Sequence, residues 1–217
     1  MDTELLSYLE TFISPERKER FLEVLEKRTR FLTVVVEDVF QMHNTSAIIR
    51  SCEVFGIQDI HVIEDRFGKQ LDKNIAMGAQ QWVDVHRYGN SLECIESLRK
   101  QGYQIAATTP NAENRSLMDF EVTDKLALFF GTEKEGLGKE VMSAADSFIT
   151  IPMAGFTESL NVSVSAAIVL HHLTDKLRKS HFPWMLTDSE KRTKRLDWTK
   201  KSIKSIDEIL RRYHDSN

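Results

Sequence analysis

The sequence has few cysteines and no long apolar run, and both absences argue against whole classes of protein. Its 217 residues include only Cys52 and Cys94, with no CxxC pair, so neither a disulfide scaffold nor a cysteine-built zinc site is indicated. No apolar run approaches the roughly 18 residues that a membrane span needs. The acidic start of the chain lacks the order of a signal peptide. We therefore expect a cytoplasmic protein that does not enter a membrane.

Several catalytic signatures are missing as well. Residues 37–44, which follow the first apolar run, contain no glycine, so the dinucleotide-binding fingerprint is absent. Gly131 and Gly136 have the spacing of a P-loop, but no Lys-Ser/Thr pair follows them. The sequence also has no HExxH, GxSxG or paired-carboxylate pattern. Nucleotide hydrolysis, zinc proteolysis and serine hydrolysis are therefore not indicated.

Along the chain, short apolar runs typical of strands alternate with segments whose apolar residues have helical spacing. The composition, 41% apolar and 29% charged, is that of a soluble globular protein. Short, β-branched or apolar runs predict strands at 31–36, 60–63, 82–88, 103–108, 126–130 and 148–151. Segments with helical spacing predict helices at 44–55, 92–100 and 162–179, with a short helix between the last two strands. Such alternation predicts the α/β class, with a mostly parallel sheet and helices on both faces.

Charge divides the chain into three parts. Residues 1–30 carry 6 basic and 7 acidic side chains, residues 31–173 carry 11 and 19, and residues 174–217 carry 12 and 7. We expect an α/β core at 31–173 with helical extensions at 1–30 and 174–217, the second including a basic helix at about 188–212. The asymmetry indicates a nucleic-acid partner contacted through the ends of the chain, or else a solvated helix of mixed charge.

Three segments combine polar residues with a strand end or a helix start, where α/β folds place ligand sites. They are His43–Arg50, Leu128–Gly138 and Ile151–Ser165. Each has a purely structural alternative. Asn44, Ser159 and Asn161 have the residue types that cap helices. Arg50 has a long side chain that can extend to solvent from an apolar helix face, and Glu133 can be a solvated acid.

Taken together and in this order, the three segments resemble the signature motifs of the SpoU (TrmH) family of SPOUT RNA methyltransferases. The resemblance covers residues 31–173, and His43-Asn-x-Ser-Ala-Ile-Ile-Arg50 is most similar to the branch that methylates the ribose 2′-hydroxyl of guanosine 18 in the tRNA D-loop. It implies a deep trefoil knot at the C-terminal end of the core, which periodicity does not reveal. It also implies a homodimer whose sites take residues from both copies, with S-adenosylmethionine as methyl donor.

The resemblance also assigns roles to single residues. It implies that the donor is held largely by backbone groups at Thr108, Leu128, Gly131, Ile151, Met153 and Leu160. The catalytic set that it implies consists of Arg50, Asn44, Glu133, Ser159 and Asn161. We expect Arg50 to hold a phosphate and stabilise charge on the attacking oxygen, because a guanidinium practically never gives up its proton. Asn44 and Glu133 are then expected to orient that guanidinium.

One departure and two alternatives accompany this reading. Where this branch commonly has glutamine before the serine of the third motif, the chain has Glu158, whose charge is unfavourable near RNA unless it is paired. The basic clusters of both extensions are expected to grip RNA, and Trp184 and Trp198 either stack on bases or pack in the protein. Methylation of another tRNA nucleotide or of 23S ribosomal RNA, and RNA binding without catalysis, are the alternative functions.

Overall fold

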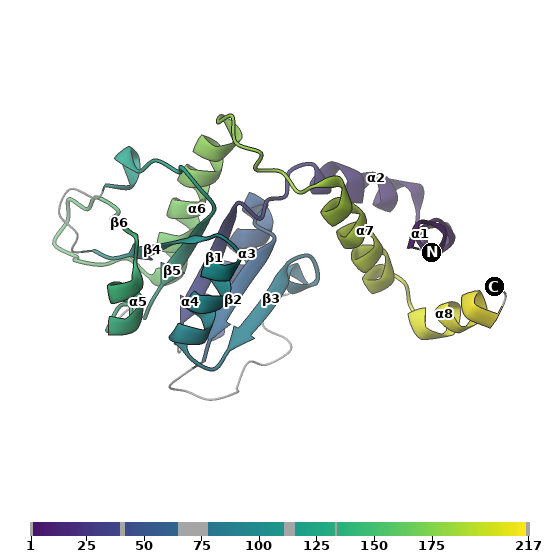
Figure 1. Ribbon diagram of the computed structural model, residues 1–217, viewed down its shortest axis with the longest axis horizontal. Coiled ribbons are helices and arrows are strands. Elements are labelled where there is room, and N and C mark those ends of the chain that lie inside the picture. The colour runs from purple at the N-terminus through teal and green to yellow at the C-terminus, as the bar shows by residue number, and fades with distance from the viewer. Residues whose placement is uncertain (1, 40–41, 65–77, 111–115, 133, 216–217) are drawn as a thin grey trace. The chain divides into compact units, whose positions relative to one another are not determined.

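A sheet of six parallel strands lies at the centre of the fold (Figure 1). The structure is a computed structural model and describes residues 2–39, 42–64, 78–110, 116–132 and 134–215. The strands are β1 (Leu32–Glu37), β2 (Asp59–Ile63), β3 (Asp84–Tyr88), β4 (Gln104–Thr108), β5 (Leu126–Phe130) and β6 (Ser147–Ile149). They lie in the order β3-β2-β1-β5-β4-β6, and every pairing is parallel. The predicted α/β class is confirmed.

Helices cover both faces of this sheet, because its strands are apolar on both sides. In β1, Val34 belongs to one hydrophobic cluster and Val35 to the other, as the alternation of side chains along a strand requires. Helices α3 (Met42–Phe55) and α6 (Val162–Arg178) pack on the Val34 face. Helices α4 (Ser91–Lys100) and α5 (Lys139–Ala144) pack on the Val35 face.

The chain divides into two units, of which Thr29–Trp184 holds the sheet and Met1–Arg28 with Met185–Asn217 forms the other. The second unit contains α1 (Asp2–Leu9), α2 (Pro15–Leu25), α7 (Asp188–Ser202), α8 (Ile206–Asp215) and the short 3-10 helix η1 (Glu10–Phe12). Two further 3-10 helices, η2 (Ala79–Gln81) and η3 (Leu117–Asp119), belong to the sheet unit. The division into 1–30, 31–173 and 174–217 stays a prediction.

The helical unit has a small aromatic core. Trp198 is 1% exposed, and its ring meets that of Phe21 edge-on, with centroids 5.6 Å apart. Trp198 therefore packs in the protein and is not available to stack on a base. Ser14 caps α2 by accepting a hydrogen bond from the backbone N–H of Arg17, and Pro15 is the first helical residue, a position that proline favours.

Two predicted boundaries are wrong. The helix expected from Asn44 begins at Met42, so Asn44 lies inside α3 and does not cap it. The single helix expected at 188–212 is two helices, α7 and α8, separated at Ser205, whose φ of 56° is left-handed and incompatible with a continuous helix. No glycine or proline between Ser202 and Ile206 marks this break in the sequence, although α8 has an apolar stripe of its own at Ile206, Ile209 and Leu210. Among the described residues, none of the helices has the length and apolar character to cross a bilayer.

Candidate functional site

A cavity of about 330 Å³ lies at the carboxyl ends of three neighbouring strands. Thr108 ends β4, Gly131 follows β5 and Ile151 follows β6, and all three line the cavity. Parallel α/β sheets bind ligands at this edge, and the volume lies within the range of small-molecule pockets, roughly 300–1,000 Å³. The cavity is therefore the candidate site of the sheet unit.

Most of the residues that the sequence assigned to the donor meet at this cavity. Five of the six line it: Thr108, Gly131, Ile151, Met153 and Leu160. Leu128 does not, because it lies in the middle of β5, paired with Val34 and Ala106, and its side chain is fully buried in the core. The remaining lining residues include Thr109, Lys134, Glu135 and Ser165, of which the last three lie in the chosen segments and Thr109 follows Thr108.

The wall formed by residues 131–136 depends on the glycine at its start. Thr132 and Gly136 exchange backbone hydrogen bonds of 3.1 and 3.0 Å, which folds the segment back on itself. A Cβ on Gly131 would lie 2.3 Å from the carbonyl carbon and oxygen of Gly136, closer than atoms approach in proteins. Only glycine at position 131 lets these two stretches of backbone come so close together. The same lack of a side chain leaves the backbone open to a ligand.

The first and third motifs are joined by a hydrogen bond between two asparagines. The side-chain amide of Asn161 donates to the side-chain oxygen of Asn44 at 3.1 Å. The Asn161 oxygen accepts from the backbone N–H of Ser163 at 2.9 Å and from its hydroxyl at 2.6 Å, so Asn161 caps α6. Asn44 is 2% exposed. The capping role expected as an alternative for Asn161 is confirmed, and Asn44 supports that cap from α3.

Arg50 lies apart from these groups within a single copy of the chain. It is exposed, it does not line the cavity, and it forms no ion pair with any residue that the structure describes. Arg50 follows Asn44 by six positions, a rotation of about 240° around the helix axis, so the two residues occupy different faces of α3. Ser159 is exposed and lines the cavity. Glu133 lies outside the described residues, and its neighbours Thr132 and Lys134 line the cavity.

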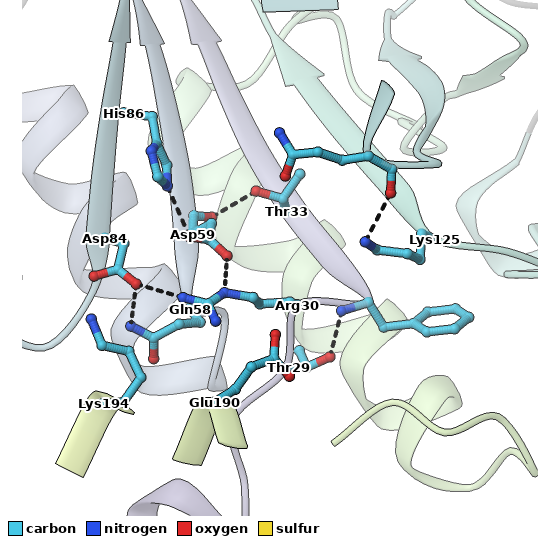
Figure 2. Close-up of polar contacts among 12 residues, drawn as sticks. Thr29, Arg30, Thr33, Gln58, Asp59, Asp84, His86, Lys125, Glu190 and Lys194 are labelled. Carbon is cyan, nitrogen blue, oxygen red and sulfur yellow. Dashed lines mark hydrogen bonds and ion pairs between the residues drawn. The ribbon is translucent and has the colours of Figure 1, made fainter. Parts of the chain in front are cut away.

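A second polar cluster of the sheet unit begins at the opposite edge, where β2 and β3 start (Figure 2). Asp59 accepts hydrogen bonds from Arg30 at 2.7 Å and from His86 at 2.9 Å, and Arg30 also pairs with Asp84 at 2.8 Å. Burial raises the pKa of Asp59, but these hydrogen bonds and the Arg30 charge outweigh it and hold that pKa below its ordinary value. The hydrogen bond to Asp59 in turn raises the pKa of His86.

The same cluster keeps one histidine neutral. The ring of His61 stacks on that of His86 with centroids 4.8 Å apart, and His61 is 3% exposed. Burial, followed by the charge of His86, lowers the pKa of His61 to about 4. These perturbed groups none the less line no part of the cavity, and their ion pairs and hydrogen bonds tie β2 and β3 to Arg30. We interpret this cluster as structural.

Comparisons with known proteins agree with the geometry. Residues 31–171 match the model of the SpoU rRNA Methylase family. The tRNA (guanosine(18)-2′-O)-methyltransferase of Borreliella burgdorferi is 41% identical over 208 residues, which cover 94% of this chain and 95% of that protein. The structure of the A. aeolicus TrmH/SpoU tRNA modifying enzyme matches with a TM-score of 0.76 and 30% identity, covering 87% of this chain and 98% of that one.

A more distant solved structure shares the fold alone. The SpoU methyltransferase AviRb of Streptomyces viridochromogenes, in complex with AdoMet, matches with a TM-score of 0.61 and 23% identity. The match covers 74% of this chain and 63% of that one. At this identity the likeness concerns the arrangement of strands and helices, and it agrees with a parallel α/β core.

Proposed function

This chain belongs to the SpoU rRNA Methylase family, and on that premise we propose that it transfers a methyl group from S-adenosylmethionine to the ribose 2′-hydroxyl of guanosine 18 in tRNA. The substrate is proposed from the near full-length similarity to the B. burgdorferi enzyme. The chemistry rests on one observation, the cavity at the carboxyl ends of β4, β5 and β6, which residues of the second and third motifs line together. The proposal thus names the methyl donor, the tRNA acceptor and the bond that forms, between the methyl carbon and the ribose 2′-oxygen.

The residues around the cavity fit the donor by size and by chemical character. Ile151, Met153 and Leu160 offer apolar surface suited to the flat adenine ring. Lys134 and Glu135 bring one charge of each sign to the rim, which suits the carboxylate and ammonium groups of the methionine moiety. When bound, the donor supplies a methyl group on a sulfonium, whose positive charge is lost as the neutral thioether leaves.

The residues of the chain then have to align the ribose 2′-hydroxyl with the methyl group and stabilise the negative charge that develops on its oxygen. Alignment at near-attack distance supplies much of the acceleration, because the methyl group is already activated. Ser159 and the Asn44–Asn161 pair shape the loop before α6 on one side of the cavity. Arg50, with Glu133 orienting it, uses its five N–H donors to hold the adjacent phosphate and to stabilise negative charge that develops on the 2′-oxygen, whose proton passes to solvent water.

The proposal includes a homodimer and the trefoil knot. The loop before α6 exposes Phe156 completely, with Met153 and Leu160 38% and 36% exposed. Exposed apolar side chains this close together in the sequence of one loop are typical of a surface that a protein partner covers. Since Arg50 does not reach the cavity of its own copy, a second copy seated on this loop is the proposed way to bring an Arg50 to each site. We further propose that the enzyme acts on tRNA in the cytoplasm.

Cations of the helical unit are the proposed contacts with RNA phosphates. Several basic residues of the terminal segments are already neutralised there: Lys191 pairs with Glu26 at 2.6 Å, and Lys18 and Arg195 both pair with Glu10. Six others form no ion pair with the described residues, namely Arg17, Lys27, Arg192, Lys200, Lys204 and Arg211. This second set is the one whose charge is open to a phosphate.

A methyl-transfer assay on unmodified tRNA tests the proposed function. We expect label from the donor to appear as a 2′-O-methyl mark at guanosine 18, and a tRNA with 2′-deoxyguanosine at that position to accept none. Arg50→Ala is expected to lower the rate at least about a hundredfold, because it removes a transition-state contact, while donor binding by calorimetry survives. Marks at another tRNA nucleotide or in ribosomal RNA alone would contradict the target. Absence of donor binding by the wild type would contradict the enzyme itself.

A further inference from the structure

Glu37 is a buried acid at the carboxyl end of the central strand β1, and no step of the proposed chemistry uses it. It is 6% exposed. One carboxylate oxygen accepts a hydrogen bond from the Ser91 hydroxyl, and the other accepts from the backbone N–H of Gly138 at 2.6 Å. Glu37 therefore ties the end of β1 to the first residue of α4 and to the residue that precedes α5.

Two donors hold this carboxylate in place of a cation. Among the residues that the structure describes, no lysine, arginine or histidine forms an ion pair with Glu37. Burial of a carboxylate without partners is strongly unfavourable, and hydrogen bonds accepted by a charged group offset this penalty more than those between neutral groups do. Both donors lie where a helix begins, and peptide dipoles at a helix N-terminus favour negative charge. The arrangement suits an acid better than an apolar residue.

The bond to Gly138 fixes one end of the cavity wall. Residues 131–137 contribute Gly131, Thr132, Lys134, Glu135, Gly136 and Leu137 to the lining. The wall is attached at one end to β5 through Gly131, and at the other end Gly138 lies so close to Glu37 that a Cβ there would be 3.1 Å from its oxygen. The two ends of this wall are thus held by β5 and β1, and these two strands pair with each other in the sheet.

We propose that Glu37 is a positioning residue for the donor: its carboxylate, through Gly138, holds residues 131–132 and 134–138 in the shape that binds S-adenosylmethionine. The inference rests on the proposed function, since it assigns the cavity to that donor. Glu37 touches neither the cavity nor the reacting atoms. Its removal is therefore expected to weaken donor binding far more than it slows the reaction once donor is saturating.

The first experiment compares two substitutions of Glu37 in the full-length protein. Glu37→Ala removes the acceptor of Gly138, and we expect calorimetry to give a donor dissociation constant raised at least about tenfold. Glu37→Gln keeps an oxygen for the Gly138 N–H and offers its amide N–H to the Ser91 oxygen, so binding is expected within about threefold of the wild type. Hydrogen exchange of residues 134–138 should be faster in Glu37→Ala and not in Glu37→Gln.

A second pair of variants reaches the same contact from the other side. Gly138 has φ of −64°, which any residue adopts, so Gly138→Ala adds only a methyl group against the Glu37 carboxylate. We expect it to weaken donor binding as Glu37→Ala does, with the affinity for tRNA unchanged. Gly89→Ala is the matched control, because a Cβ at Gly89 meets nothing within 4 Å, and it is expected to bind donor as the wild type does.

The outcomes distinguish failure of the proposed function from failure of the positioning role of Glu37. A wild type that binds no donor would overturn the proposed function. A wild type that binds donor, together with Glu37→Ala or Gly138→Ala proteins that bind it equally well, would overturn the positioning role alone. Should Glu37→Ala fail to fold, Gly138→Ala against Gly89→Ala decides: a selective loss of donor affinity supports the role, and equal affinity contradicts it.

Discussion

The side-chain amide of Asn161 donates a hydrogen bond to the side-chain oxygen of Asn44, which lies 117 positions earlier in the chain. Asn44 is buried on α3, and Asn161 is the cap of α6 and follows directly on the lining residues Ser159 and Leu160. The two helices that cover one face of the sheet are thus joined at the rim of the cavity. A polar pair in this place couples the stability of a helix start to the shape of a ligand site.

Removal of the Asn161 side chain should therefore affect both stability and donor binding. Asn161→Ala loses the cap of α6 and leaves Asn44 without this donor, at a cost of about 1–3 kcal/mol in the free energy of unfolding. Denaturant unfolding and donor calorimetry measure the two effects. Ser14→Ala is the control, because it removes the cap of α2 in the helical unit and should cost about 1 kcal/mol without any change in donor affinity. Equal donor affinity in both variants would contradict the coupling.

Replacement of Phe156 tests the proposed dimer. Phe156→Asp places a charge where a second copy is expected to bury an aromatic ring, which should convert the dimer to monomer in sedimentation experiments at micromolar concentration. Methyl transfer should fall with the dimer fraction, since each site is proposed to need Arg50 of the other copy. Leu92→Asp is the control, because Leu92 is 53% exposed on α4 and lies outside this loop. A monomeric wild type would contradict the dimer.

His61 predicts a fall in stability on mild acidification. Its pKa is lowered to about 4 in the folded chain, whereas the unfolded chain binds the proton near 6.5. Between these values the unfolded state takes up more protons, so stability is full above about pH 6.5 and falls as the pH decreases toward 4. The shift corresponds to about 3 kcal/mol. His61→Phe should flatten the curve of unfolding free energy against pH in this window, and an unchanged curve would contradict the assignment.

The ion pairs of the helical unit predict which cations contact tRNA. Arg192→Ala and Lys200→Ala should each weaken tRNA binding and reduce the slope of log affinity against log salt by about 1, as the loss of one phosphate contact does. Lys18→Ala should change the slope little, because Lys18 is already neutralised by Glu10. Filter binding over a range of salt concentrations measures all three. Equal slopes for the paired and unpaired cations would show that these ion pairs do not persist in solution.

Local pattern accounts for most of the core elements. The apolar runs and helical spacings of 126–130, 162–179 and 92–100 correspond to β5, α6 and α4 within a residue or two, because periodicity of apolar residues reflects which faces are buried. The break at Ser205 was missed, because no glycine or proline near it marks the end of a helix and a serine with a φ of 56° is uncommon. For Trp198 the residue type allows base stacking or packing, of which packing was favoured, and its burial confirms packing.

The sequence by itself determined the parallel α/β class, the cap at Asn161, and two segments that line the cavity, Leu128–Gly138 and Ile151–Ser165, because each of these depends on residues close together in the chain. The tertiary structure alone decided that Asn44 supports Asn161, that Glu37 holds Gly138 across 101 positions, and that Glu10 neutralises Arg195. Hydrogen bonds and ion pairs of this kind depend on which strands and helices become neighbours. The order in which strands pair is a property of the whole packed chain, and no local period of apolar residues contains it.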